Sequence, residues 1–196
     1  MNPESLLIAS AAALALYLLT DQQGQGGVAE VIDSAVSTLD SAFMSIDQST
    51  LENPNVQAFL ALIKYGESGG DYQVMWGGSH FADFSGHPHV FFTTPDGRRT
   101  SAAGAYQITW TTWTALARQY TLADFSPASQ DFAAVALIKV RGALADVMAG
   151  RFDRAIAKCR PEWTSLPGAM EQGYSLDKAH QIIVAAGGQF EGSTIA

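Results

Sequence analysis

Glu67 stands where a carboxyl group could donate a proton during catalysis. It follows Ile63 by four residues, so it continues the apolar face of a predicted helix and lies at the end of that helix. A carboxyl group there would be partly desolvated, which favours its protonated form near neutral pH. Gly69 and Gly70 follow it and would let a polymer approach the backbone closely. By position alone the commoner alternative stays open, a glutamate that points into solvent or pairs with Lys64.

A proton donor of this kind is typical of enzymes that cleave glycosidic bonds, which commonly use two carboxyl groups. Asp71, Asp83 and Asp96 lie in the loop region that follows Glu67. None of them has a spacing that marks a nucleophile, and Asp96 falls in a predicted turn. A single-carboxylate mechanism therefore remains open, in which one group acts first as acid and then as base. The attacking hydroxyl would belong either to water or to the sugar itself.

Other kinds of chemistry have weaker support in the sequence. His87 and His89 are two residues apart on a loop, but no cysteine or HExxH motif accompanies them as further metal ligands. No G-x-S-x-G motif of a serine hydrolase occurs. The sequence therefore predicts an enzyme that uses no metal and no cofactor.

The charge is divided unevenly along the chain, which has a net charge of −8. Seven acidic residues and no lysine or arginine precede Lys64, whereas acids and bases nearly balance after it. No basic stripe is present that could neutralise phosphates, so nucleic-acid binding is not expected. The excess negative charge belongs to the N-terminal appendage.

The main domain is predicted to span residues 53–187. Asn53 and Pro54 are typical of a helix start, and an apolar stripe from Val56 to Ile63 follows them. The run HVFFTT at 89–94 and the turn after it predict a short β-hairpin. Further helices are expected at 105–120, 129–148, 153–159 and 175–186. The expected fold class is α+β, mostly helical with a small hairpin.

Aromatic side chains are abundant in this domain. Most are expected in the core, but several would suit stacking on sugar rings along a loop-lined groove. The candidates are Tyr65, Tyr72, Trp76, Tyr106, Trp110, Trp113 and Trp163.

Residues 1–20 contain an uncharged run from Ser5 to Thr20. As a helix it would be roughly 24 Å long, slightly shorter than the ~30 Å hydrocarbon core of a bilayer. A cleaved signal peptide would need a basic start and an A-x-A site, and neither is present. A buried core helix is a further alternative. A transmembrane anchor, with an orientation that the flanking charges do not define, is the preferred interpretation.

Residues 21–52 are predicted to form a glycine-rich hinge and an amphipathic stalk helix. The apolar positions from Val28 to Ile46 recur at spacings of three and four, which would suit packing on a neighbouring copy or on a virion protein. Residues 188–196 are expected to be a tail.

Six short segments in order make residues 55–187 resemble the lambda-type lytic transglycosylases, a family of phage endolysins. The segments are GESG at 66–69, FADFSGHP at 81–88, AGAYQ at 103–107, DFSPASQD at 124–131, KVRGAL at 139–144 and WTSLPGA at 163–169. Each segment alone is unspecific, but together they cover nearly the whole domain. Residues 1–52 have no counterpart in this resemblance.

The resemblance implies a lysozyme-like fold and cleavage of the β-1,4 bond between N-acetylmuramic acid and N-acetylglucosamine, with a 1,6-anhydro product. It assigns Glu67 as the only catalytic carboxyl group. Tyr106 and Gln107 would line the cleft beside it, with Asp83 and His87 on the other wall. Trp163, one of the aromatic residues suited to stacking on sugar rings, is a further expected substrate-binding residue. Gly86 and Ala105 stand where the family has an acid and an arginine, so these two positions lack the family's charged side chains.

The expected function is that of a phage enzyme that degrades bacterial peptidoglycan during genome entry or lysis. It would be held in the virion membrane or the host inner membrane, with its catalytic domain reaching the periplasm. The alternative is a membrane-tethered structural protein that binds peptidoglycan without cleaving it.

Overall fold

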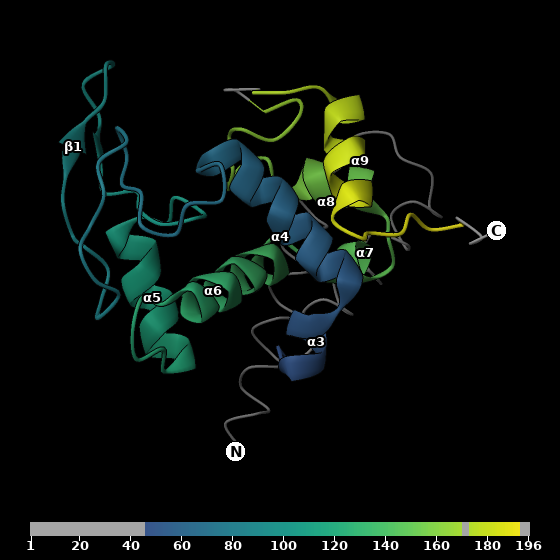
Figure 1. Cartoon of the computed structure of the whole chain (residues 1–196), viewed down its shortest axis with the longest axis horizontal. Helices are drawn as coiled ribbons and strands as arrows, with labels where there is room; N and C mark the ends of the chain where they lie inside the picture. Colours follow the sequence, from purple (N-terminus) through teal and green to yellow (C-terminus); the bar gives the residue numbers. More distant parts are fainter. Residues whose placement is uncertain (1–45, 170–172, 193–196) are drawn as a thin grey trace, which may run out of the picture.

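The computed structural model describes residues 46–169 and 173–192, which form a helical body beside one short hairpin (Figure 1). The predicted α+β class, mostly helical with a small sheet, is confirmed. The elements are α3 (Gln48–Glu52), α4 (Pro54–Glu67), β1 (Phe92–Thr93), β2 (Arg99–Thr100), α5 (Trp110–Tyr120), α6 (Pro127–Val140), α7 (Leu144–Met148), α8 (Phe152–Cys159) and α9 (Leu176–Ala185).

Helix α4 runs through the middle of the molecule and contacts α3, α6, α7 and α9 (Figure 1). It begins as predicted, because the Asn53 side chain accepts hydrogen bonds from the backbone N–H groups of Asn55 and Val56. The apolar stripe from Val56 to Ile63 is fully buried. The position of Glu67 at the end of α4 is therefore determined by the packing of the whole helix.

The predicted hairpin is confirmed, although its strands are only two residues long. Phe92 pairs with Thr100 and Thr93 with Arg99 in antiparallel register. The turn between them is closed by hydrogen bonds between the backbone groups of Thr94 and residues 97 and 98. Figure 1 shows this hairpin at one edge of the molecule, on the side away from α9.

Two predicted helices differ from those in the structure. The helix predicted at 105–120 begins only at Trp110, because residues 103–108 form a tight turn in which Gly104 and Gln107 have positive φ angles. The helix predicted at 129–148 is two helices, α6 and α7. Gly142 has a φ of 65° and ends the first of them.

The body extends at both ends beyond residues 53–187. Asp47 caps α3, which lies at the end of the segment predicted as hinge and stalk helix, and Leu51 packs against the core. After α9, the ring of Phe190 meets Phe152 with 5.0 Å between centroids. The backbone N–H of Glu191 donates to the Gly150 carbonyl oxygen.

The predicted membrane segment at 5–20 lies outside the described residues, as does the stalk helix up to residue 45. Within residues 46–169 and 173–192, no helix has the length and apolar character that a membrane span requires.

Candidate active site

Glu67 is half-buried at the last helical position of α4 and receives a hydrogen bond from a distant part of the chain. The Ser165 hydroxyl, 98 residues away in sequence, donates to Glu67 Oε1 over 2.6 Å. Ser165 reaches it because Gly66 has no side chain: a Cβ there would lie 2.5 Å from Ser165 Oγ and 2.9 Å from Tyr174 Cε1. The GESG segment thus combines an acid with the space that its partner needs.

Tyr174 packs against the same helical turn, beside Ser165. Its hydroxyl donates to the Leu62 carbonyl oxygen, and its ring meets the Tyr65 ring edge-on. Burial raises the pKa of Tyr174 strongly, and the negative charge of Glu67 adds to this effect. Tyr174 therefore remains a neutral hydroxyl beside the acid over the physiological pH range.

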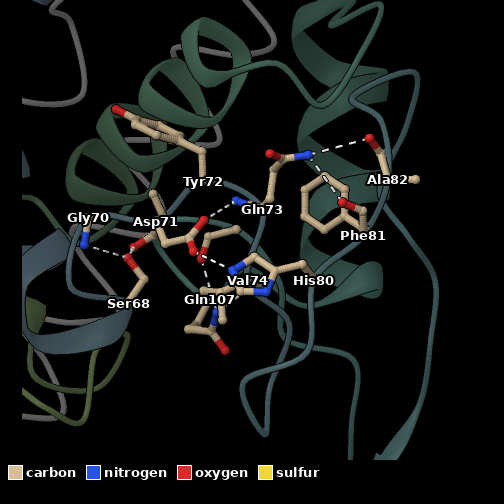
Figure 2. A network of polar contacts seen from close by, with 12 residues as sticks. Ser68, Gly70, Asp71, Tyr72, Gln73, Val74, His80, Phe81, Ala82 and Gln107 are labelled. Atoms are coloured by element: carbon tan, nitrogen blue, oxygen red, sulfur yellow. Dashed lines mark hydrogen bonds and ion pairs between the residues drawn. The ribbon is translucent and has the colours of Figure 1, made fainter.

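The loop that follows α4 engages Asp71, one of the candidate second carboxylates (Figure 2). Asp71 accepts a hydrogen bond from the Gln73 backbone N–H and lies 2.5 Å from Nε2 of His80. Both contacts, first that with Gln73, lower the pKa of Asp71. Figure 2 shows the carboxylate turned toward His80, so Asp71 is an ionised group that fastens the start of the loop to residue 80.

The other two candidate carboxylates are exposed turn residues. Asp83 accepts hydrogen bonds from the Ser85 hydroxyl and the Ser85 backbone N–H, and both lower its pKa. Asp96 is bound by the Thr94 hydroxyl and by Arg98, which lower its pKa to about 2. The predicted turn role of Asp96 agrees with this geometry, and Asp83 likewise shapes its own loop.

Gln107 lies in the tight turn at 103–108, next to Val74 (Figure 2). Its side-chain amide donates to the Gly104 carbonyl oxygen over 3.0 Å and to that of Val74 over 3.3 Å. The hydroxyl of Ser68, the residue after Glu67, donates to the Ala105 carbonyl oxygen over 2.9 Å. This bond ties the catalytic turn to the turn that carries Gln107, so two predicted site residues are brought into one region.

Tyr106 and Trp163 were predicted to contact sugar, but their side chains are 1% and 2% exposed. The Tyr106 hydroxyl donates to Asp131, and burial raises its pKa well above the ordinary value. The Trp163 indole N–H donates to the Tyr106 carbonyl oxygen over 3.2 Å. Both side chains support the turn at 103–108 from inside instead of presenting a face to a ligand. Tertiary packing decides this, and residue type alone does not indicate it.

His87 is also buried, beside the rings of Phe125 and Trp110. Its Nε2–H donates to the Ile108 carbonyl oxygen, and its Nδ1 accepts from the His89 backbone N–H. Burial lowers the pKa of His87. Both ring nitrogens are thus satisfied in the neutral form, and His87 packs the loop instead of lining a wall with a free imidazole.

Lys64, the alternative partner considered for Glu67, belongs to a separate polar cluster. Its ammonium donates to the Tyr72 hydroxyl over 2.8 Å, and that hydroxyl donates to Asp131 over 2.7 Å. Asp131 also binds Tyr106, so this cluster joins α4, the loop and α6. Its members were not predicted as a group, because they come from distant parts of the sequence.

Comparisons with known proteins agree with this architecture. Residues 57–190 match the family model for endolysins. The chain is 42% identical over 115 residues to the endolysin of Escherichia phage P2, covering 55% of this chain and 70% of that protein. It is 43% identical over 98 residues to the endolysin of Escherichia phage lambda, covering 50% of this chain and 62% of that protein.

Solved structures give the same result. Bacteriophage lambda lysozyme complexed with a chitohexasaccharide aligns with a TM-score of 0.65 and 34% identity, covering 71% of this chain and 97% of that one. A second structure of the bacteriophage lambda lysozyme aligns with a TM-score of 0.62 and 35% identity. The fold and site therefore define a lysozyme-like, peptidoglycan-cleaving glycosidase. The chain belongs to the endolysin family, and the resemblance drawn from its sequence motifs is confirmed.

Proposed function

We propose that this endolysin is a lytic transglycosylase that cleaves the bond between N-acetylmuramic acid and N-acetylglucosamine with Glu67 as its only catalytic carboxyl group. The observation that carries the proposal is the setting of Glu67, which alone among the four candidate carboxyl groups lies at the end of a helix and binds a hydroxyl group from a distant part of the chain. Glu67 is half-buried with a serine hydroxyl on one oxygen, whereas Asp71, Asp83 and Asp96 are held ionised by neighbouring loop residues. Chitohexasaccharide bound to the lambda lysozyme supports a β-1,4-linked amino-sugar polymer as substrate.

The mechanism needs one group that gives and then takes a proton. Glu67 would protonate the glycosidic oxygen as the bond from that oxygen to muramoyl C1 breaks. The resulting carboxylate would then remove the proton from the muramoyl C6 hydroxyl, whose oxygen forms the new bond to C1. Ser165 would stabilise the carboxylate between the two steps by its hydrogen bond. Glu67 ends the cycle protonated, so the reaction consumes no water and needs no second carboxylate.

The Glu67→Gln variant tests the assignment on purified peptidoglycan, with mass spectrometry of the released fragments. We expect activity to fall by about 10²–10⁴-fold, the usual contribution of general acid–base catalysis. Asp71→Asn is the matched control and should retain most activity. Undiminished cleavage by Glu67→Gln would remove Glu67 from the mechanism, and reducing ends without anhydro sugars would make the enzyme a hydrolase. Binding of wild-type protein to sacculi without fragment release would favour the non-catalytic alternative.

We further propose that residues 5–20 tether the enzyme to a membrane and that residues 28–46 form a stalk that associates with itself or with a virion protein. The uncharged run and the apolar spacing that follows it support this proposal. The tether would hold the catalytic domain in the periplasm, beside the cell wall. Membrane flotation of the full chain and of residues 46–196 tests it: only the full chain should float with vesicles. Equal behaviour of both chains would exclude the tether.

A further inference from the structure

An exposed aromatic ring and an ammonium group lie next to the catalytic turn, and the cleavage mechanism uses neither. Tyr65 is 49% exposed and precedes Glu67 by two residues on α4. The Lys178 ammonium, in the first turn of α9, lies 5.7 Å from the centroid of the Tyr65 ring. Together these two side chains form the Tyr65–Lys178 pair.

Tyr174 connects this pair to the catalytic acid. Its ring meets Tyr65 edge-on at 5.4 Å between centroids and comes within 2.9 Å of the place where a Gly66 Cβ would lie. Ser165, which donates to Glu67, approaches the same point of Gly66. The pair and the acid are therefore linked through the packing around Gly66, with Tyr65 and Glu67 on α4 and Lys178 on α9.

The charge of Lys178 differs in its surroundings from that of four other basic groups in the described residues. Arg98, Arg141, Arg151 and Lys158 each form an ion pair with a carboxylate. Lys178 instead has its ammonium over the exposed face of an aromatic ring. A cation in this arrangement can accept a carboxylate from a ligand while the ring covers apolar atoms of the same ligand.

We propose that the Tyr65–Lys178 pair is a subsite for the stem peptide carried by the lactyl group of muramic acid. This inference rests on the proposed function, since it assumes that the glycan binds at Glu67. The stem peptide brings carboxylates next to the sugar that undergoes cleavage, and the pair supplies a cation and an apolar face beside that position. The subsite distinguishes muramic acid that carries a peptide from bare amino sugar.

The test compares soluble peptidoglycan strands that carry stem peptides with the same strands after an amidase has removed them. For Lys178→Gln we expect KM on peptide-bearing strands to rise about threefold with kcat unchanged, the size typical of an exposed ion pair. The rise should shrink as salt is added, because exposed charges are screened. On stripped strands KM should not change. Arg118→Gln is the control, because it removes the same charge from α5, which Figure 1 shows far from α9.

A second pair of variants keeps the test independent of Lys178. Tyr65→Phe should behave as wild type, whereas Tyr65→Ala should raise KM on peptide-bearing strands, with thermal unfolding measured to verify the fold. Equal effects of Lys178→Gln on both substrates, or no effect on either, would overturn the subsite. An active Glu67→Gln variant would overturn the proposed function instead, so the two failures are distinguishable.

Discussion

The helical body and the loop segment 68–109 are stabilised in different ways. In the body, α4, α6 and α8 bury long runs of apolar side chains, such as the consecutive buried residues 133–138 of α6. The loop segment has two strands of two residues each, and side-chain hydrogen bonds to backbone groups hold its turns. The body therefore supplies most of the free energy of folding and also Glu67 and Ser165, whereas the loop segment contributes the turn that carries Gln107.

Phe59→Ala would test this difference most strongly. Phe59 is fully buried and packs on Phe152, so we expect a loss of about 3–5 kcal/mol in the free energy of unfolding. The loss should leave kcat of the folded fraction nearly unchanged. Phe91→Ala in the hairpin is the control, since Phe91 is exposed and its loss should cost less than about 1 kcal/mol. Equal losses in denaturant unfolding would contradict the division between body and loop.

Gln130→Ala would act on the junction between the two regions. The buried Gln130 side chain binds three backbone groups of the loops: the Ala105 N–H and the carbonyl oxygens of Tyr72 and Phe125. Its removal should cost about 3 kcal/mol, because each unsatisfied buried group costs about 1–3 kcal/mol. Unlike Phe59→Ala, it should also lower kcat, since the turn at 103–108 loses its support. Urea unfolding and kinetics of the exposed Gln119→Ala variant provide the comparison.

Ser165→Ala should separate activity from stability within the site. A hydrogen bond to a charged group contributes about 1.5–3 kcal/mol, so kcat should fall about tenfold to a hundredfold with little change in thermal unfolding. In Ser165→Ala the Glu67 carboxylate loses a hydrogen-bond donor, so the Glu67 carboxyl group should keep its proton to higher pH than in the wild type. The alkaline limb of the pH–rate profile should therefore move upward. An unchanged profile would mean that Ser165 does not act on Glu67.

His87 should give the loop a modest dependence on pH. Burial lowers the pKa of His87 below its ordinary value of 6.5, so the unfolded chain takes up a proton before the folded chain does. The stabilisation is complete above about pH 6.5 and is lost as pH falls below it, by at most about 1.4 kcal/mol per pH unit. Denaturant unfolding at pH 7, 6 and 5 should show a smaller slope for His87→Gln than for wild type.

The sequence was sufficient to predict elements whose signals are local. The start of α4 was predictable because Asn53, Pro54 and the apolar stripe lie side by side in the chain. The break between α6 and α7 was not, since α6 is apolar on nearly all sides and its periodicity does not reveal its end. The hairpin was predicted from its turn, but the length of its strands depends on contacts such as that between Trp76 and Phe92.

The sequence was sufficient to predict the acid of the candidate site, but not the residues that surround that acid. Glu67 follows from helix periodicity and motif, whereas Ser165 joins it only through the fold. Tyr106 and Trp163 show the converse, because aromatic residues suited to stacking are enclosed by the core. Side-chain exposure is a property of the packed molecule, and a single sequence does not encode it in any short pattern.

Gly66 makes the catalytic turn less stable than an ordinary helical turn with alanine at that position would be. In a solvent-exposed helix interior, alanine in place of glycine would add about 1 kcal/mol of stability. Here that methyl group would collide with Ser165 and Tyr174. Directed selection for thermostability alone would therefore favour changes elsewhere in α4, and any variant that gains a side chain at Gly66 should lose both stability and catalytic rate.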